Sequence, residues 1–185
     1  MHLLFRGKRV KTSFALAFFL AIFTLLAQTE QIPATGAATA PAQEPVLKVG
    51  GDVLTPAQLK LSDLSRMPRI DVRVKDRDGD NVTYSGVSLT EVLRAAGLKL
   101  DPSSVPTRDI VSSYILVLAA DGYRAVFASA EVDPAQTDRL ILLADHKNGQ
   151  FLSANEGPFR IVYPGEKRPA RWVRQVQSIL VNRPE

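Results

Sequence analysis

Short strand-like segments, closed by tight-turn residues, recur along residues 46–185, and this pattern limits the possible folds more than any other feature of the chain. Residues 70–75 alternate apolar and charged side chains, which is the period of a half-exposed strand. The apolar runs "YILVLA" and "RAVFA" flank Asp121-Gly122, and "RLILLAD" is followed closely by Asn148-Gly149. Both dipeptides favour two-residue hairpin turns. The sequence therefore predicts several hairpins joined by short loops.

Helix signals are few by comparison. Ser88 and Glu91 match a capping box before an apolar face, and Gly97 supplies the residue at which that helix ends. A second helical segment is predicted before Pro68, with Thr55 as N-cap ahead of a proline and Ser62 as another cap. Strands and short helices that do not alternate strictly indicate an α+β domain.

The N-terminus has the composition of an export signal. Residues 1–13 carry four Lys or Arg and no acid, and an apolar run from Phe14 to Ala27 follows. As a helix this run would rise about 21 Å, less than the ~30 Å hydrocarbon core of a membrane. We predict that residues 1–27 are a Sec-type signal peptide cleaved after Ala27, which places the mature protein in the periplasm or outside the cell. The alternative is an uncleaved membrane anchor.

The remaining sequence divides into a linker and one domain. Residues 28–45 are rich in Ala, Thr and Pro and carry no aromatic side chain, as expected of a flexible linker. Residues 46–185 have the length of one domain. The chain has 23 basic and 19 acidic residues, and residues 1–27 contribute four of the basic ones, so 19 of each sign remain. This balance gives no support for nucleic-acid binding.

Metal and catalytic motifs are incomplete. Asp76, Asp78 and Asp80 have the spacing of an EF-hand loop, but Asn81 and Val87 stand where that loop needs Gly and Glu, so a polar turn is expected. The lone mature histidine, His146, lies beside a turn and lacks partner ligands in sequence. There is no serine-nucleophile motif, and Asp121 and Glu156 are carboxylate candidates only because each adjoins a glycine. We predict no catalytic residue and no metal ligand.

A basic segment near the C-terminus is the strongest site candidate. It contains Arg160, Lys167, Arg168, Arg171 and Arg174 around Trp172, with only Glu166 to oppose them. Arginine is a multi-donor cation suited to phosphate or sulfate, so one interpretation is an anion site. The other is a solvated edge whose aliphatic stems cover Trp172, and charge alone favours it. Arg171 and Arg174 share a face if a helical turn forms there before the last strand.

Four stretches, in order, resemble the molybdopterin-binding domain of the sulfite oxidase family. They are "YSGVSLTEVLRAAGL" (84–98), "AADGYRAVFA" (119–128), "NGQFLSANEGPFRIVYPG" (148–165) and "ARWVRQVQSILV" (170–181). The set covers most of the domain, and its order and spacing are more specific than any one motif. The resemblance implies an α+β fold with mixed β-sheets and an oxidoreductase ancestry.

One departure from the family pattern bears on catalysis. The resemblance implies that active members bind molybdenum through a cysteine sulfur, placed after the strand that precedes the Tyr-x-Gly-Val stretch. Here that region reads "VRVKDRDGDNVTYSG", and the whole chain has no cysteine. A hard carboxylate in place of a soft thiolate would change the ligand field of the metal. The leader also lacks the twin-arginine pattern typical of relatives exported with their cofactor bound.

We therefore expect an exported, non-catalytic relative that acts as a binding or sensing accessory. The candidate contacts are Arg160, Arg168, Arg171 and Trp172, with Asp121, Tyr123 and Asn155 near the same rim. The expected partner is a small anion or an envelope protein, with no nucleic acid, and with membrane contact only through an uncleaved leader. No cofactor is expected; molybdopterin is the alternative that the resemblance implies. The rival function is a molybdopterin-dependent oxidoreductase without a cysteine ligand, in which an Asp near position 76 replaces the thiolate.

Overall fold

The computed structural model describes residues 44–76, 78–100 and 103–184. The predicted signal peptide and nearly all of the predicted linker lie outside the described residues. The remainder belongs to one compact unit, residues 42–185. None of the helices within the described ranges has the length and apolar character needed to cross a membrane.

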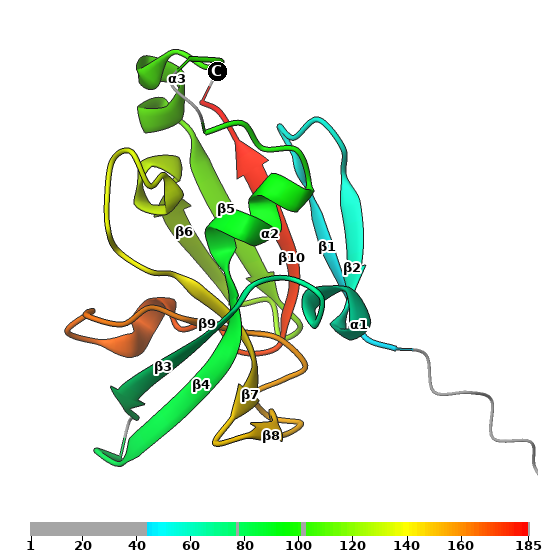
Figure 1. The fold of residues 1–185 in the computed structure, drawn as a ribbon, viewed down its shortest axis with the longest axis vertical. Coiled ribbons are helices and arrows are strands. Elements are labelled where there is room, and N and C mark those ends of the chain that lie inside the picture. The colour runs from blue at the N-terminus through cyan, green and yellow to red at the C-terminus, as the bar shows by residue number, and fades with distance from the viewer. Residues whose placement is uncertain (1–43, 77, 101–102, 185) are drawn as a thin grey trace, which may run out of the picture. The chain divides into compact units, whose positions relative to one another are not determined.

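The strands form two sheets (Figure 1). The first contains, in spatial order, β2 (Ala57–Lys60), β1 (Val46–Gly51), β10 (Val176–Asn182), β5 (Tyr114–Ala119) and β6 (Arg124–Ala128). The second contains β3 (Arg69–Lys75), β4 (Asn81–Ser88), β7 (Leu142–Lys147) and β8 (Gln150–Phe151), with β9 (Arg160–Val162) also paired to β7. β1 and β10 are parallel and the other pairs are antiparallel, so the first sheet is mixed, as predicted.

The helices are short and sit between strands. They are α1 (Leu61–Leu64), α2 (Leu89–Ala95) and α3 (Thr107–Ser112), together with two 3-10 turns, η1 (Ser129–Val132) and η2 (Pro169–Arg171). α2 begins as predicted, because the Glu91 amide donates to Ser88 Oγ at 3.2 Å. It ends at Ala95, and Gly97, which follows the C-cap residue Ala96, has a φ of +79° that favours glycine.

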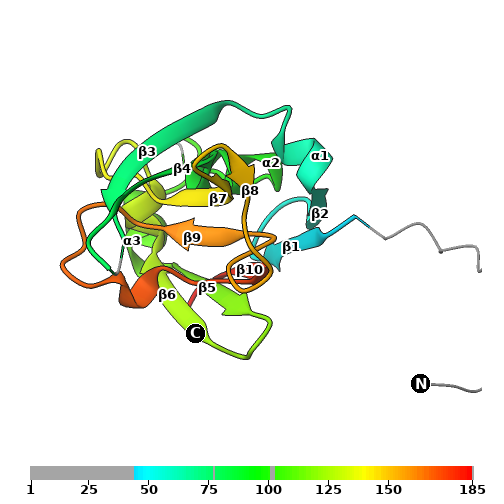
Figure 2. The same ribbon diagram turned by 90° about the horizontal axis from the view of Figure 1, so that it is seen from below.

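The two sheets form separate layers, with β3, β4 and β7 on one side and β1, β10, β5 and β6 on the other (Figure 2). The main hydrophobic core combines Val92 of α2 with inward side chains of both sheets, such as Phe127 on β6 and Leu143 on β7. A smaller core surrounds Tyr84 in the second sheet. The indole of Trp172 packs against both cores, so the segment that carries it is fixed where the two meet.

The prediction of a helix that begins at Thr55 is wrong. Residues 57–60 form β2 instead, paired antiparallel with β1, and the helix that follows spans only Leu61–Leu64. Ala57 and Leu59 pack against the main core while Gln58 and Lys60 are exposed. This alternation with period two, together with the pairing to β1, outweighed the Thr-Pro start signal.

Candidate anion-binding site

A cavity of about 900 Å³ opens beside the turn between β3 and β4. Four other parts of the chain complete its wall: the turn between β5 and β6, the end of β7, the residues before and within β9, and the segment from Glu166 to Arg174. Its lining residues are Lys75, Asp76, Asp78, Tyr84, Asp121, Tyr123, Lys147, Glu156, Arg160, Glu166, Lys167, Arg168, Pro169, Ala170, Trp172, Val173 and Arg174.

The floor of the cavity is a guanidinium held between two aromatic rings. The Arg160 guanidinium lies 5.1 Å from the centre of the Tyr84 ring and 5.9 Å from that of Trp172, and Arg160 Nη1 donates to Tyr84 Oη at 2.9 Å. β4 and β9 both pair with β7, and this shared neighbour brings Tyr84 and Arg160 together. The Trp172 Nε1–H donates to the Tyr163 carbonyl at 2.9 Å, which fixes the indole.

Carboxylates neutralise the charges of the floor. Glu156 Oε1 accepts from Arg160 Nη1 and lies 3.7 Å from Lys147 Nζ. Lys147 Nζ is also 3.9 Å from Asp76 Oδ2, while Asp76 Oδ1 accepts the amides of Asp78 and Asp80 at 3.0 and 3.1 Å. Asp76 is therefore committed to the polar turn that the sequence predicted.

Four exposed cations surround the floor, and we call them the cationic rim: Lys75, Lys167, Arg168 and Arg174. Within the described ranges none of the four forms an ion pair or a side-chain hydrogen bond with another residue. Their charges are thus available to a ligand, and an anion entering the cavity meets them before it meets the floor.

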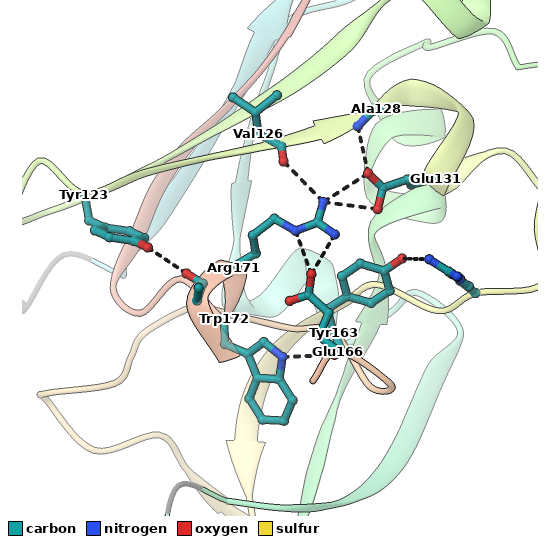
Figure 3. Close-up of polar contacts among 10 residues, drawn as sticks. Tyr123, Val126, Ala128, Glu131, Tyr163, Glu166, Arg171 and Trp172 are labelled. Carbon is teal, nitrogen blue, oxygen red and sulfur yellow. Dashed lines mark hydrogen bonds and ion pairs between the residues drawn. The ribbon is translucent and has the colours of Figure 1, made fainter. Parts of the chain in front are cut away.

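Arg171 binds carboxylates of the protein itself, as Figure 3 shows. Its Nη1 lies 3.0 Å from Glu131 Oε1 and its Nε 2.7 Å from Glu166 Oε1, and the guanidinium is 4.8 and 5.0 Å from the rings of Phe127 and Tyr163. Burial opposes the charge on Glu131, but hydrogen bonds from Arg171 and the Ala128 amide outweigh it and lower the pKa of Glu131. Arg171 therefore ties η2 to β6 and η1.

The structure brings together most of the predicted site residues. Arg160, Arg168, Trp172, Asp121 and Tyr123 all line the cavity, whereas Arg171 and Asn155 are not among its lining residues. Tyr123 Oη donates to the Ala170 carbonyl at 2.7 Å (Figure 3), so the Asp-Gly turn supports η2.

Two features of the site were missed or misjudged from sequence. Arg171 and Arg174 share a face only if the turn around Trp172 is helical, but η2 ends at Arg171, and of the two only Arg174 lines the cavity. Lys147 and Tyr84 were not predicted as site residues. Their juxtaposition follows from the β4–β7 register, in which Tyr84 is opposite Lys147, and no local pattern of the sequence encodes that register.

The lone described histidine belongs to a separate cluster. Asp145 is buried; its Oδ2 accepts from Arg69 Nη1 at 2.9 Å and its Oδ1 lies 2.7 Å from His146 Nδ1. Burial opposes the charge on Asp145, but the hydrogen bonds from Arg69 and His146 lower its pKa. The cluster joins β3 to β7 across β4. No three His, Asp or Glu side chains of the described residues converge as a metal site would require.

The fold is an α+β domain with two sheets, and comparison with known proteins gives the family. The sequence model of the oxidoreductase molybdopterin binding domain matches residues 36–185, and the chain belongs to this family. Among solved structures, the sulfane dehydrogenase SoxCD from Paracoccus pantotrophus is similar, with a TM-score of 0.58 and 22% sequence identity. The match covers 75% of this chain and 38% of that one, and at this identity it concerns the fold. The search of curated proteins found no match.

The residues of the site do not fit a molybdenum centre held by a protein thiolate. The chain has no cysteine. The carboxylate nearest to the expected ligand position that also lines the cavity is Asp76, and one of its oxygens accepts two amides of its own turn. The donor set around the cavity consists instead of cations, carboxylates and aromatic rings, which suits an anionic ligand.

Proposed function

We propose that this chain is an exported, non-catalytic member of the family that binds a small anion in the cavity as a binding or sensing accessory. The observation that carries the proposal is the cationic rim, whose four charges have no partner among the described residues while the chain has no cysteine to ligate molybdenum. Export rests on the composition of residues 1–27. An envelope protein with an acidic surface would contact the same rim.

The rim suits an oxyanion such as sulfate or phosphate. Arg168 and Arg174 each offer a planar fork of donors, and Lys167 adds a point charge close to them in the chain. The neighbouring Trp172 is fixed by its hydrogen bond to the Tyr163 carbonyl and gives the ligand a rigid apolar wall. The floor, already neutralised by Glu156, contributes less to the attraction.

A sulfate titration of the full chain, followed by NMR at low ionic strength with chloride as reference, tests the proposal. Arg168→Ala is expected to weaken sulfate binding about five- to tenfold, the effect of losing one charge-assisted contact. Arg108→Ala is the matched control, because Arg108 is exposed on α3 and does not line the cavity. Equal affinity in wild type and Arg168→Ala would refute the role of the rim.

Metal analysis of protein purified from its native source tests the rival function. We expect no stoichiometric molybdenum and no pterin absorbance. One molybdenum per chain, together with turnover of an oxyanion or sulfoxide, would establish a molybdopterin-dependent oxidoreductase in place of the binding module.

A further inference from the structure

A carboxylate of the protein already occupies the position where an anion would reach the floor of the cavity. Glu156 contacts Arg160 Nη1 and lies 3.7 Å from Lys147 Nζ, so it pairs with both floor cations, and Lys147 shares its charge between Glu156 and Asp76. Arg160 also donates to Tyr84, and its Nε is buried without a hydrogen-bond partner. The guanidinium thus keeps an Nε–H donor that Glu156 does not use.

The attachment of Glu156 lets its carboxylate move while its backbone stays fixed. The Glu156 amide donates to the Ser153 carbonyl at 2.9 Å, and its own carbonyl accepts from the Gln175 amide at 2.9 Å. The side chain is 19% exposed and lines the cavity rather than the core. Rotation about its side-chain bonds would separate the carboxylate from Arg160 and Lys147, and Lys147 would keep Asp76 Oδ2 at 3.9 Å.

We propose that Glu156 is a built-in competitor that selects against anions at the floor. An oxyanion enters between Arg160 and Lys147 only when it displaces this carboxylate, so the wild-type protein holds its ligand mainly at the rim. The inference rests on the proposed anion-binding function and deepens it by assigning the specificity of the floor to one residue. The ligand class is a carboxylate, sulfate or phosphate group that takes the place of the Glu156 carboxylate.

The test is a sulfate titration of the full chain carrying Glu156→Gln. Removing the competing charge is expected to tighten sulfate binding about tenfold, since a charge-assisted hydrogen bond to Arg160 becomes available. Asp78→Asn is the matched control, because it removes one negative charge from the cavity wall without touching Arg160. The gain is expected to disappear in the double variant Glu156→Gln with Arg160→Gln.

The outcomes separate this inference from the proposed function. Suppose that Arg168→Ala weakens sulfate binding but that Glu156→Gln and Asp78→Asn bind sulfate with affinities within about twofold of each other. The role of the cationic rim is then supported and the competitor role of Glu156 is refuted. If Arg168→Ala leaves the sulfate affinity unchanged while Glu156→Gln binds sulfate more tightly, binding at the floor is supported and the role of the cationic rim is refuted. If Glu156→Gln does not fold, Glu156→Asp replaces it, because this change shortens the side chain and keeps the charge. Glu156→Asp is expected to bind sulfate more tightly than the wild type and less tightly than predicted for Glu156→Gln. No gain in sulfate affinity would refute the inference.

Discussion

Arg168 and Arg171 are three positions apart and have opposite roles. Arg168 is exposed at the cavity and pairs with no described residue, whereas Arg171 is 31% exposed and contacts Glu131 and Glu166. Glu131 and Glu166 are partly buried, and a partly buried carboxylate that loses its cation becomes costly because it remains partly removed from water without compensation. Arg171 thus belongs to the stability of the domain, and Arg168 belongs to its surface chemistry.

Arg171→Met is expected to lower the free energy of unfolding at pH 7 by about 2 kcal/mol, while Arg168→Ala leaves it nearly unchanged. The folded-state pKa of Glu131 is depressed, so its contribution is complete above the unfolded-state pKa and is lost as the pH falls through the folded-state value. The deficit of Arg171→Met should therefore shrink below about pH 4. Urea denaturation at several pH values measures it, and a deficit independent of pH would contradict the ion-pair explanation.

At the level of elements, the position of β7 between its neighbours builds the floor of the site. Tyr84 on β4 is opposite Lys147, and Arg160 on β9 is opposite Ala144, so three strands present the floor residues side by side. Gly86 lies where β4 approaches β7 most closely. A Cβ atom there would lie 2.1 Å from the Leu143 carbonyl oxygen.

Gly86→Ala is therefore expected to destabilise the domain by about 3 kcal/mol or more, because backbone atoms of the neighbouring strand have to move. Gly50→Ala is the control in a strand of the other sheet, since its Cβ would meet only the Leu180 Cδ2 atom, at 3.6 Å. We expect that change to stay within about 1 kcal/mol. Thermal unfolding of the two variants checks this. Similar stabilities would show that β4 and β7 leave room for a Cβ atom at position 86.

At the level of the whole molecule, residues 42–185 form one compact unit whose two sheets share a core. Trp172 contacts both the main core and the smaller core around Tyr84, so its fluorescence reports on the region where they meet. A single shared core predicts a single cooperative transition.

A chain comprising residues 42–185 is expected to fold without the preceding segment and to unfold in one step. Urea curves followed by Trp172 fluorescence and by far-UV circular dichroism should coincide. Separate midpoints would show that the two sheets unfold independently, and failure to fold would show that the N-terminal residues are required.

Local signals in the sequence determined the hairpins and the capped helix. Alternation in residues 70–75, the Asp121-Gly122 and Asn148-Gly149 turns, and the Ser88 cap each depend on neighbours within a few residues, so a linear pattern encodes them. The absence of cysteine is likewise a property of composition. Family membership followed from motif order, because such order reflects a shared arrangement of elements.

Only the tertiary structure decided which charged side chains are free. Arg168 and Arg171 look alike in sequence, yet the carboxylates that neutralise Arg171 come from residues 131 and 166, and the first of these lies on a distant segment. The same holds for β2, which the Thr-Pro signal predicted as helix and which pairing with β1 made a strand. Pairing between distant segments decides whether residues 57–60 form a strand, and the distances between charges decide which arginine is neutralised. The local sequence pattern determines neither.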